Sequence, residues 1–222
     1  MIEGGGQGLF RQEPLSPSSK PPPPTPYRGV KGEFEGRVGD PLRKTSPGPP
    51  LKPLRILLTG PPQCGKTTVV QKVVARFPGQ AAGFYTREVR QQGIRLGFEI
   101  ITLAGATALL SHVDFPGPHR VGKYGVNLEN FHRVALPALE VGPGVDLIVV
   151  DEVGKMECLS ARFVAAMESL WRQPAPLLVT VAEKGGGYIA TLKGKPDKTL
   201  LTVTPANRDE LPTRILELLR TR

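Results

Sequence analysis

Eight residues that directly follow a short apolar run have the types and spacing of a phosphate-binding loop. Residues 60–67 read Gly-Pro-Pro-Gln-Cys-Gly-Lys-Thr and match the pattern G-x-x-x-x-G-K-[ST] at every fixed position. Glycines let such a loop curl until its N–H groups point at phosphate oxygens, and a following helix adds a favourable dipole. Lys66 is placed to neutralise the β- and γ-phosphates, and the Thr67 hydroxyl can bind Mg²⁺. The alternative is a chance Gly-Pro turn with an exposed lysine.

Two carboxylates follow the apolar run of residues 145–150. Asp151 stands where a Mg²⁺ ion beside a phosphate loop needs a carboxylate. Glu152 can polarise a water molecule for attack on the γ-phosphorus, whereas transfer to an organic acceptor needs no such group. The alternative is an acidic turn that caps a strand. We expect the next acid, Glu157, to be a solvated helix residue.

The surrounding pattern supplies the elements that these residues require. Residues 54–59 form a short apolar run typical of a buried strand, and apolar residues at helical spacing follow until Pro78-Gly79. Further strands and helices alternate along the chain, which predicts an α/β layered P-loop fold with a mainly parallel sheet. The remaining predicted elements are a β-hairpin insertion after the first helix, turning at Gly93; helices over 127–139 and 163–171, the first capped by Asn127; strands at 176–181 and 199–203; and a last helix with Asn207 as N-cap.

Glycine and proline divide the chain of 222 residues into two parts. Residues 1–53 hold 9 of the 26 Gly and 12 of the 24 Pro, so few apolar groups remain there to offset the entropy of ordering. We expect a disordered extension over 1–53 and one P-loop NTPase domain over 54–222. The run Pro21–Pro24 indicates polyproline II structure, which serves either as a spacer or as a ligand for an aromatic groove. The sequence names no protein partner for it.

The net charge of +9 suits a polyanion such as a nucleoside triphosphate. No run of basic residues supports a nucleic-acid partner, and no apolar run near 18 residues indicates a membrane span. Two cysteines and the lack of a secretory signal favour a cytoplasmic protein with reduced thiols, although a Cys64–Cys158 bridge is the alternative. The three histidines lack metal-ligand spacing.

Several segments together resemble the small P-loop nucleoside-triphosphatases, the family that includes the thermophile-type enzymes and the vertebrate cancer-related nucleoside-triphosphatase. The resemblance covers nearly all of 54–222 and none of 1–53. The segments that carry it, in order, are the phosphate loop, Gly83-Phe84-Tyr85-Thr86, Val121-Gly122-Lys123-Tyr124-Gly125-Val126, Asp151-Glu152-Val153-Gly154-Lys155-Met156-Glu157 and Val203-Thr204-Pro205-Ala206-Asn207-Arg208-Asp209.

The resemblance implies a RecA-like domain that hydrolyses ATP, GTP, CTP and UTP with Mg²⁺ and little base selectivity. It places catalysis on Lys66 and Glu152, and metal binding on Thr67 and Asp151. Gln63 departs from the family pattern, which usually has Gly at this position of the loop. The nucleotide-binding residues it implies are Gly60, Pro61, Pro62, Gln63, Cys64, Gly65, Lys66, Thr67, Thr68, Asp151, Glu152 and Gly154.

A hydrolytic site also needs a cation for the charge that develops on the transferred phosphoryl group. The candidates are Arg87, Lys123, Lys155 and Arg208. Arg208 follows a strand end at the expected ligand-binding edge, where it can contact a base or a phosphate or pair with Asp209. Two rival functions stay open on this sequence: a nucleotide or small-molecule kinase on the same fold, and an ATPase stimulated by nucleic acid.

Overall fold

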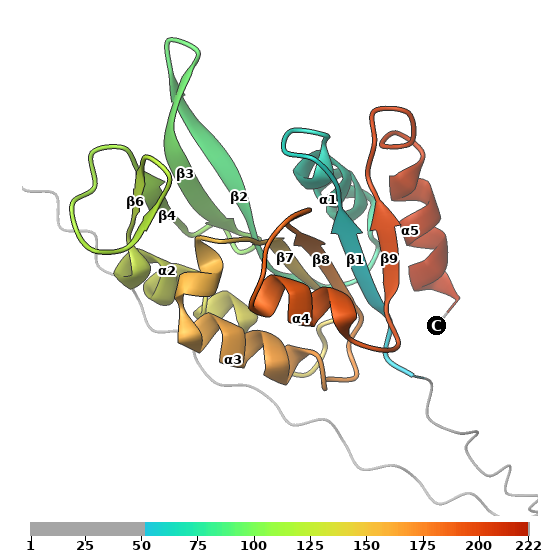
Figure 1. Cartoon of the computed structure of the whole chain (residues 1–222). Helices are drawn as coiled ribbons and strands as arrows, with labels where there is room; N and C mark the ends of the chain where they lie inside the picture. Colours follow the sequence, from blue (N-terminus) through green and yellow to red (C-terminus); the bar gives the residue numbers. More distant parts are fainter. Residues whose placement is uncertain (1–51, 222) are drawn as a thin grey trace, which may run out of the picture. The chain divides into compact units, whose positions relative to one another are not determined.

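Nine strands form one sheet within residues 52–221, the part of the chain that the computed structural model describes (Figure 1). The predicted extension over 1–53, with its polyproline run, lies outside these residues except for its last two positions. The described elements are β1 (Arg55–Thr59), α1 (Lys66–Arg76), β2 (Ala81–Gln91), β3 (Ile94–Thr102), β4 (Thr107–His112), β5 (Arg120–Val121), β6 (Tyr124–Val126), α2 (Leu128–Val134), η1 (Pro137–Leu139), β7 (Leu147–Val153), η2 (Glu157–Leu159), α3 (Ala161–Leu170), β8 (Leu177–Val181), α4 (Tyr188–Gly194), β9 (Thr199–Thr202) and α5 (Leu211–Arg220).

The strand order is β5-β6-β4-β3-β2-β7-β8-β1-β9, and it divides the sheet into two halves. From β2 to β9 all neighbours are parallel, whereas β3, β4, β5 and β6 continue the sheet as antiparallel strands. The α/β P-loop fold is therefore confirmed, with a sheet that is mixed. β8 separates β1, the strand that precedes the phosphate loop, from β7, which carries the two carboxylates near its end.

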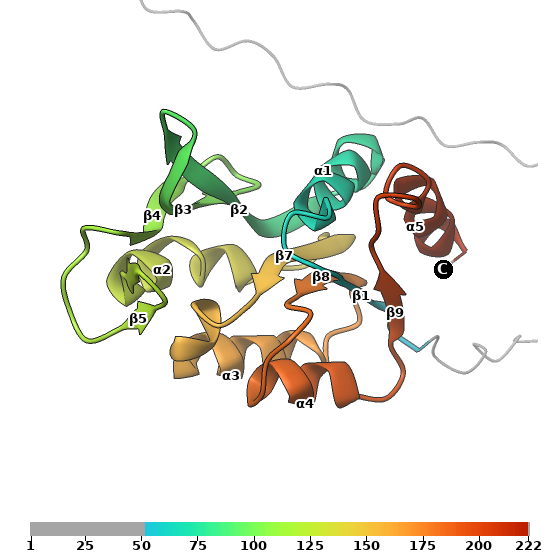
Figure 2. The same ribbon diagram turned by 45° about the horizontal axis from the view of Figure 1, so that its top comes forward.

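Helices cover both faces of the parallel half, which explains the continuous apolar runs of its strands (Figure 2). Ile56 and Leu58 of β1 face the cluster that includes residues of α1 and α5. Leu57 between them faces the cluster formed with α2, α3 and α4. All three side chains are fully buried. The sheet is thus held rigidly from both sides, and its carboxyl-terminal edge can hold a site in place.

Two predicted helix starts have different outcomes. Asn127 caps α2 as predicted, because its side chain accepts a 2.8 Å hydrogen bond from the N–H of Asn130. Asn207 was predicted to cap the last helix, and that prediction is wrong. Its side chain instead accepts from the N–H of Thr204 and donates to the carbonyl of Thr202, and α5 begins only at Leu211. The residue closes the turn between β9 and α5.

Within residues 52–221 no helix combines the length and the apolar character that crossing a bilayer requires.

Candidate active site

The phosphate loop connects β1 to α1 at the carboxyl edge of the parallel strands. Gly65 stands directly before the helix with φ +108°, a left-handed conformation that glycine adopts without steric cost. Gln63 has φ +64° at the tip of the loop, so the residue that departs from the family pattern occupies a conformation favouring glycine. Its side chain hydrogen-bonds Glu88 on β2. Cys64 packs into the core as a buried free thiol, while Pro61, Pro62 and Thr68 are exposed.

Lys66 is buried at the centre of this loop, although it carries an ammonium group. Its Nζ donates to the carbonyl of Gly60 at 3.1 Å and to that of Pro61 at 3.4 Å. The same Nζ lies 3.6 Å from a carboxylate oxygen of Glu152. The loop and the carboxyl end of β7 therefore meet, and the Lys66 side chain joins them.

Asp151 lies on the β7 end, and its carboxylate is fully enclosed. One oxygen accepts a 2.7 Å hydrogen bond from the Thr67 hydroxyl, and the other accepts from the Thr180 hydroxyl on β8. Burial raises the pKa of Asp151 to about 6, while the two hydroxyl hydrogen bonds oppose that rise. A dication nearby would favour the charged carboxylate.

The expectation for Glu157 is wrong: the residue is buried. It lies in η2, and its carboxyl oxygen accepts a 3.0 Å hydrogen bond from the backbone N–H of Gly154. A β-carbon on Gly154 would stand 2.9 Å from this oxygen and 3.0 Å from one of Glu152. Burial, with the nearby charge of Glu152, raises the pKa of Glu157 to about 8. The Gly-x-x-Glu spacing, typical of a side chain folding back on a backbone N–H, is the signal that could have revealed this contact.

The four candidate cations occupy different surroundings. Arg87 pairs with Glu99 along the β2–β3 hairpin, and Lys123 lies over the ring of Tyr124, 5.4 Å from its centroid. Lys155 is exposed on the turn after Glu152. Arg208 packs against the phosphate loop itself, because a β-carbon on Gly65 would meet its Cδ at 3.2 Å.

The pair Thr67 and Asp151 fits a hard dication. A hydroxyl and a carboxylate offer the oxygen ligands that Mg²⁺ prefers, and the 2.7 Å contact between them brings these two oxygens together. Among residues 52–221, no three His, Cys, Asp or Glu side chains gather into a site that would hold a metal alone. Such a pair suits an ion that arrives with phosphate oxygens and water as its other ligands.

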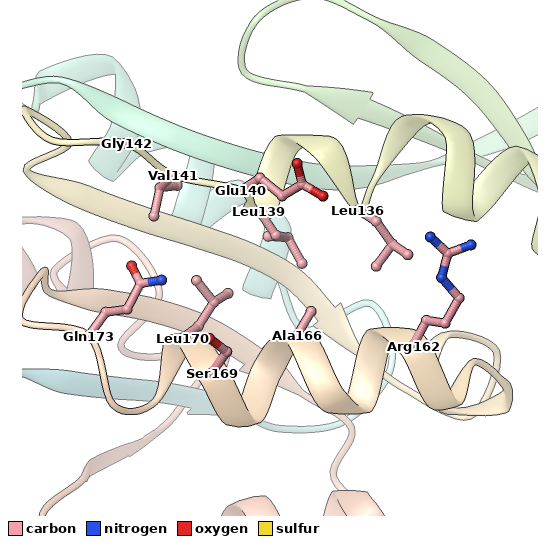
Figure 3. A pocket seen from close by; sticks show the side chains of 10 residues that line it. All are labelled: Leu136, Leu139, Glu140, Val141, Gly142, Arg162, Ala166, Ser169, Leu170 and Gln173. Atoms are coloured by element: carbon pink, nitrogen blue, oxygen red, sulfur yellow. The ribbon is translucent and has the colours of Figure 1, made fainter.

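A groove of about 530 Å³ between η1 and α3 contains none of these residues (Figure 3). Leu136 and Leu139 form one wall, and Ala166 and Leu170 form the other, with Arg162 at one end. The phosphate loop, which carries the chemistry, lies elsewhere.

Comparison with known proteins identifies the family. The family model described as NTPase matches residues 55–216. The chain belongs to this NTPase family. It is therefore a hydrolase that acts on nucleoside triphosphates, and the resemblance read from the sequence is confirmed.

The sequence of this NTPase is similar to those of proteins from a bacterium and from human. It is 38% identical over 168 residues to nucleoside-triphosphatase THEP1 of Thermotoga sp. (strain RQ2), covering 75% of this chain and 96% of the relative. It is 38% identical over 180 residues to the human cancer-related nucleoside-triphosphatase, covering 70% of this chain and 91% of that protein.

Solved structures match the fold of this NTPase as well. The crystal structure of THEP1 from the hyperthermophile Aquifex aeolicus matches with a TM-score of 0.70 and 34% identity, covering 75% of this chain and 99% of that one. The solution structure of the human cancer-related protein matches with a TM-score of 0.66 and 34% identity, covering 76% of this chain and 98% of that one.

Proposed function

We propose that this NTPase hydrolyses ATP, GTP, CTP and UTP to the diphosphate and phosphate, with Mg²⁺ and with little selectivity for the base. The observation that supports a hydrolytic centre most directly is the 3.6 Å separation between Lys66 Nζ and Glu152. A lysine in a phosphate loop neutralises the terminal phosphates, so a carboxylate beside it stands where an attacking water must be oriented.

Each group of residues in the site has its own proposed role. The backbone N–H groups of residues 60–67 and the start of α1 would bind the phosphates. Thr67 and Asp151 would hold Mg²⁺, which when bound offsets charge on the phosphate oxygens. Glu152 would accept a hydrogen bond from water and direct it at the terminal phosphorus. Thr180 on β8 donates to the carboxylate of Asp151, and Glu157 accepts from the N–H of Gly154, two residues after Glu152.

One panel of assays tests this proposal. Phosphate release is measured from each of the four triphosphates, with and without nucleosides, nucleoside monophosphates, RNA and DNA. We expect hydrolysis that needs no acceptor and that falls at least about a hundredfold in Glu152→Gln. Glu129→Gln, an exposed carboxylate on α2, is the matched control and leaves turnover unchanged.

The rival functions predict other results in the same panel. Phosphate that appears on a nucleoside or a monophosphate, with negligible transfer to water, would contradict the hydrolase and indicate a kinase. A large stimulation by RNA or DNA would indicate an ATPase that acts on nucleic acid. Lys66→Ala should abolish turnover under all three functions, so it tests only the location of the site.

We also propose that residues 1–53 are not needed for hydrolysis. All the residues assigned to the phosphate and metal site, with those that support them, lie between Gly60 and Thr180. Removal of residues 1–51 should leave kcat and KM for ATP within about twofold of the full chain, and a loss of catalysis would contradict this.

A further inference from the structure

We propose that Arg208 binds the base of the nucleotide by stacking, and that this contact makes binding indifferent to which base is present. The inference rests on the proposed function and assigns the nucleoside end of the same site. Its basis is the place of Arg208 relative to the two ends of the phosphate loop.

The sheet order gives the bound nucleotide a direction. Glu152 lies near the carboxyl end of β7, and its contact with Lys66 marks the end of the loop where the terminal phosphate is cleaved. β9 lies on the opposite side of β1 from β8 and β7. The turn that follows β9 therefore lies across the phosphate loop from Glu152. A triphosphate with its terminal group at Lys66 points its nucleoside toward this turn.

Arg208 is held against the loop at that end. Its stem covers Gly65, where a β-carbon would stand 3.2 Å from Cδ and 3.9 Å from Cβ of the arginine. The turn itself is fixed on two sides. Asp209 pairs with Lys72 of α1 at 2.7 Å, and Asn207 bonds the backbone of Thr204 and Thr202. These contacts fix the position of Arg208 beside the phosphate loop without any bound ligand.

The guanidinium remains available for a ligand. The side chain of Arg208 is 48% exposed, and its Nε lies 4.0 Å from Asp209, at the limit of an ion pair. A planar guanidinium can stack on any base, because every base presents a π-face.

The two residues that flank Arg208 in the sequence are not free to read base edges. Discrimination between bases needs a side chain that donates to or accepts from specific edge atoms. Asn207 has its amide oxygen and nitrogen committed to the turn, and Asp209 is committed to Lys72. The aromatic Tyr124 lies on β6 and accepts a hydrogen bond from Arg95, in the antiparallel half of the sheet. Stacking on Arg208 therefore provides affinity without base selectivity.

Steady-state kinetics of Arg208→Ala in the full chain test this inference. We expect KM to rise about tenfold for each of ATP, GTP, CTP and UTP, with kcat within about twofold of wild type. Inorganic tripolyphosphate, which has no base, should inhibit the variant and wild type with the same inhibition constant. Arg208→Lys keeps the positive charge but lacks the planar guanidinium that stacks on a base, so it should raise KM by an intermediate factor. Arg220→Ala, at the far end of α5, is the matched control and should change neither constant.

Three results would overturn the inference. They are an unchanged KM, a rise confined to one base, and a loss that appears in kcat or in tripolyphosphate inhibition, which would place Arg208 on the phosphates. Hydrolysis by wild type in the same assays tests the proposed function separately. A failure of Arg208 as a base contact is thereby distinguished from a failure of the hydrolase.

Discussion

The Thr67 hydroxyl donates a 2.7 Å hydrogen bond to Asp151, and this contact joins the first turn of α1 to the end of β7 across β8. Two side-chain oxygens from residues 84 positions apart in the sequence are thereby brought together. The shared contact also means that either side chain, if removed, changes the environment of the other.

The Thr67–Asp151 pair should control the Mg²⁺ requirement. Thr67→Ala removes one proposed ligand, and we expect the Mg²⁺ concentration for half-maximal activity to rise roughly 10–100-fold. Thr67→Ser retains the hydroxyl and should stay close to wild type. The measurement is phosphate release against a Mg²⁺ titration at saturating ATP. Equal Mg²⁺ dependence in the alanine variant and wild type would remove Thr67 from the metal site.

Gly154 should tolerate no side chain, because two carboxylates converge on it. Gly154→Ala would place a β-carbon about 3 Å from oxygens of both Glu152 and Glu157, so at least one of them must move. We expect kcat to fall at least tenfold, with KM for ATP nearly unchanged, since the atoms nearest the added β-carbon belong to Glu152 and Glu157 and not to the backbone of the phosphate loop. Gly142→Ala, where an added β-carbon has open space around it, is the matched control. A normal kcat in Gly154→Ala would show that Glu152 need not keep this position.

The sequence predicts a site residue where its contacts come from neighbouring positions in the chain, and it fails where those contacts depend on the folded sheet. The phosphate loop could be proposed from the sequence because a strand, a glycine turn and a helix follow one another within a few residues, and Asp151 because it ends an apolar run. Glu157 was misjudged, because its burial arises only when the turn after β7 folds back onto Gly154. From the sequence, Arg208 is a candidate cation whose partner could be a base, a phosphate or Asp209. Only the pairing of β9 with β1 brings Arg208 to the phosphate loop.

The antiparallel half of the sheet shows the same limit. The hairpin of β2 and β3 was predicted, since its strands are long and alternate around Gly93. β5 and β6 have only two and three residues, too few for a periodic pattern. Their hydrogen bonds to β4 and to each other define them, and such pairing cannot be read from so short a stretch.

Glu157 should make stability depend on pH. Its pKa is raised to about 8 in the folded chain, whereas an unfolded chain releases this proton near pH 4.5. The folded state therefore binds one more proton between these values. The stabilising contribution is fully present below about pH 4.5 and is lost as pH rises toward 8, by at most about 1.4 kcal/mol per pH unit.

Glu157→Gln isolates this effect, because the amide still accepts from Gly154 but does not titrate in this range. We expect the free energy of unfolding of wild type, relative to Glu157→Gln, to decrease steadily from pH 5 to pH 8. Urea unfolding of both proteins across that range gives the difference, and the raised pKa of Asp151 cancels in the comparison. A difference that stays constant with pH would contradict the raised pKa of Glu157.

Arg55 should stabilise the fold without taking part in hydrolysis. The residue is 2% exposed, and its guanidinium donates to the backbone carbonyls of Leu54, Trp171, Gln173 and Ala175, which connect β1 to the segment between α3 and β8. Arg55→Ala would leave these carbonyls without their donor, and we expect the free energy of unfolding to fall by about 3 kcal/mol. Arg55→Lys keeps the charge but cannot reach all the carbonyls, so its free energy of unfolding should lie between those of Arg55→Ala and wild type.

Urea unfolding measures the loss of stability. Arg220→Ala, on the exposed end of α5, is the control and should stay within about 0.5 kcal/mol of wild type. If Arg55→Ala unfolds like wild type, the buried arginine does not hold these two elements together.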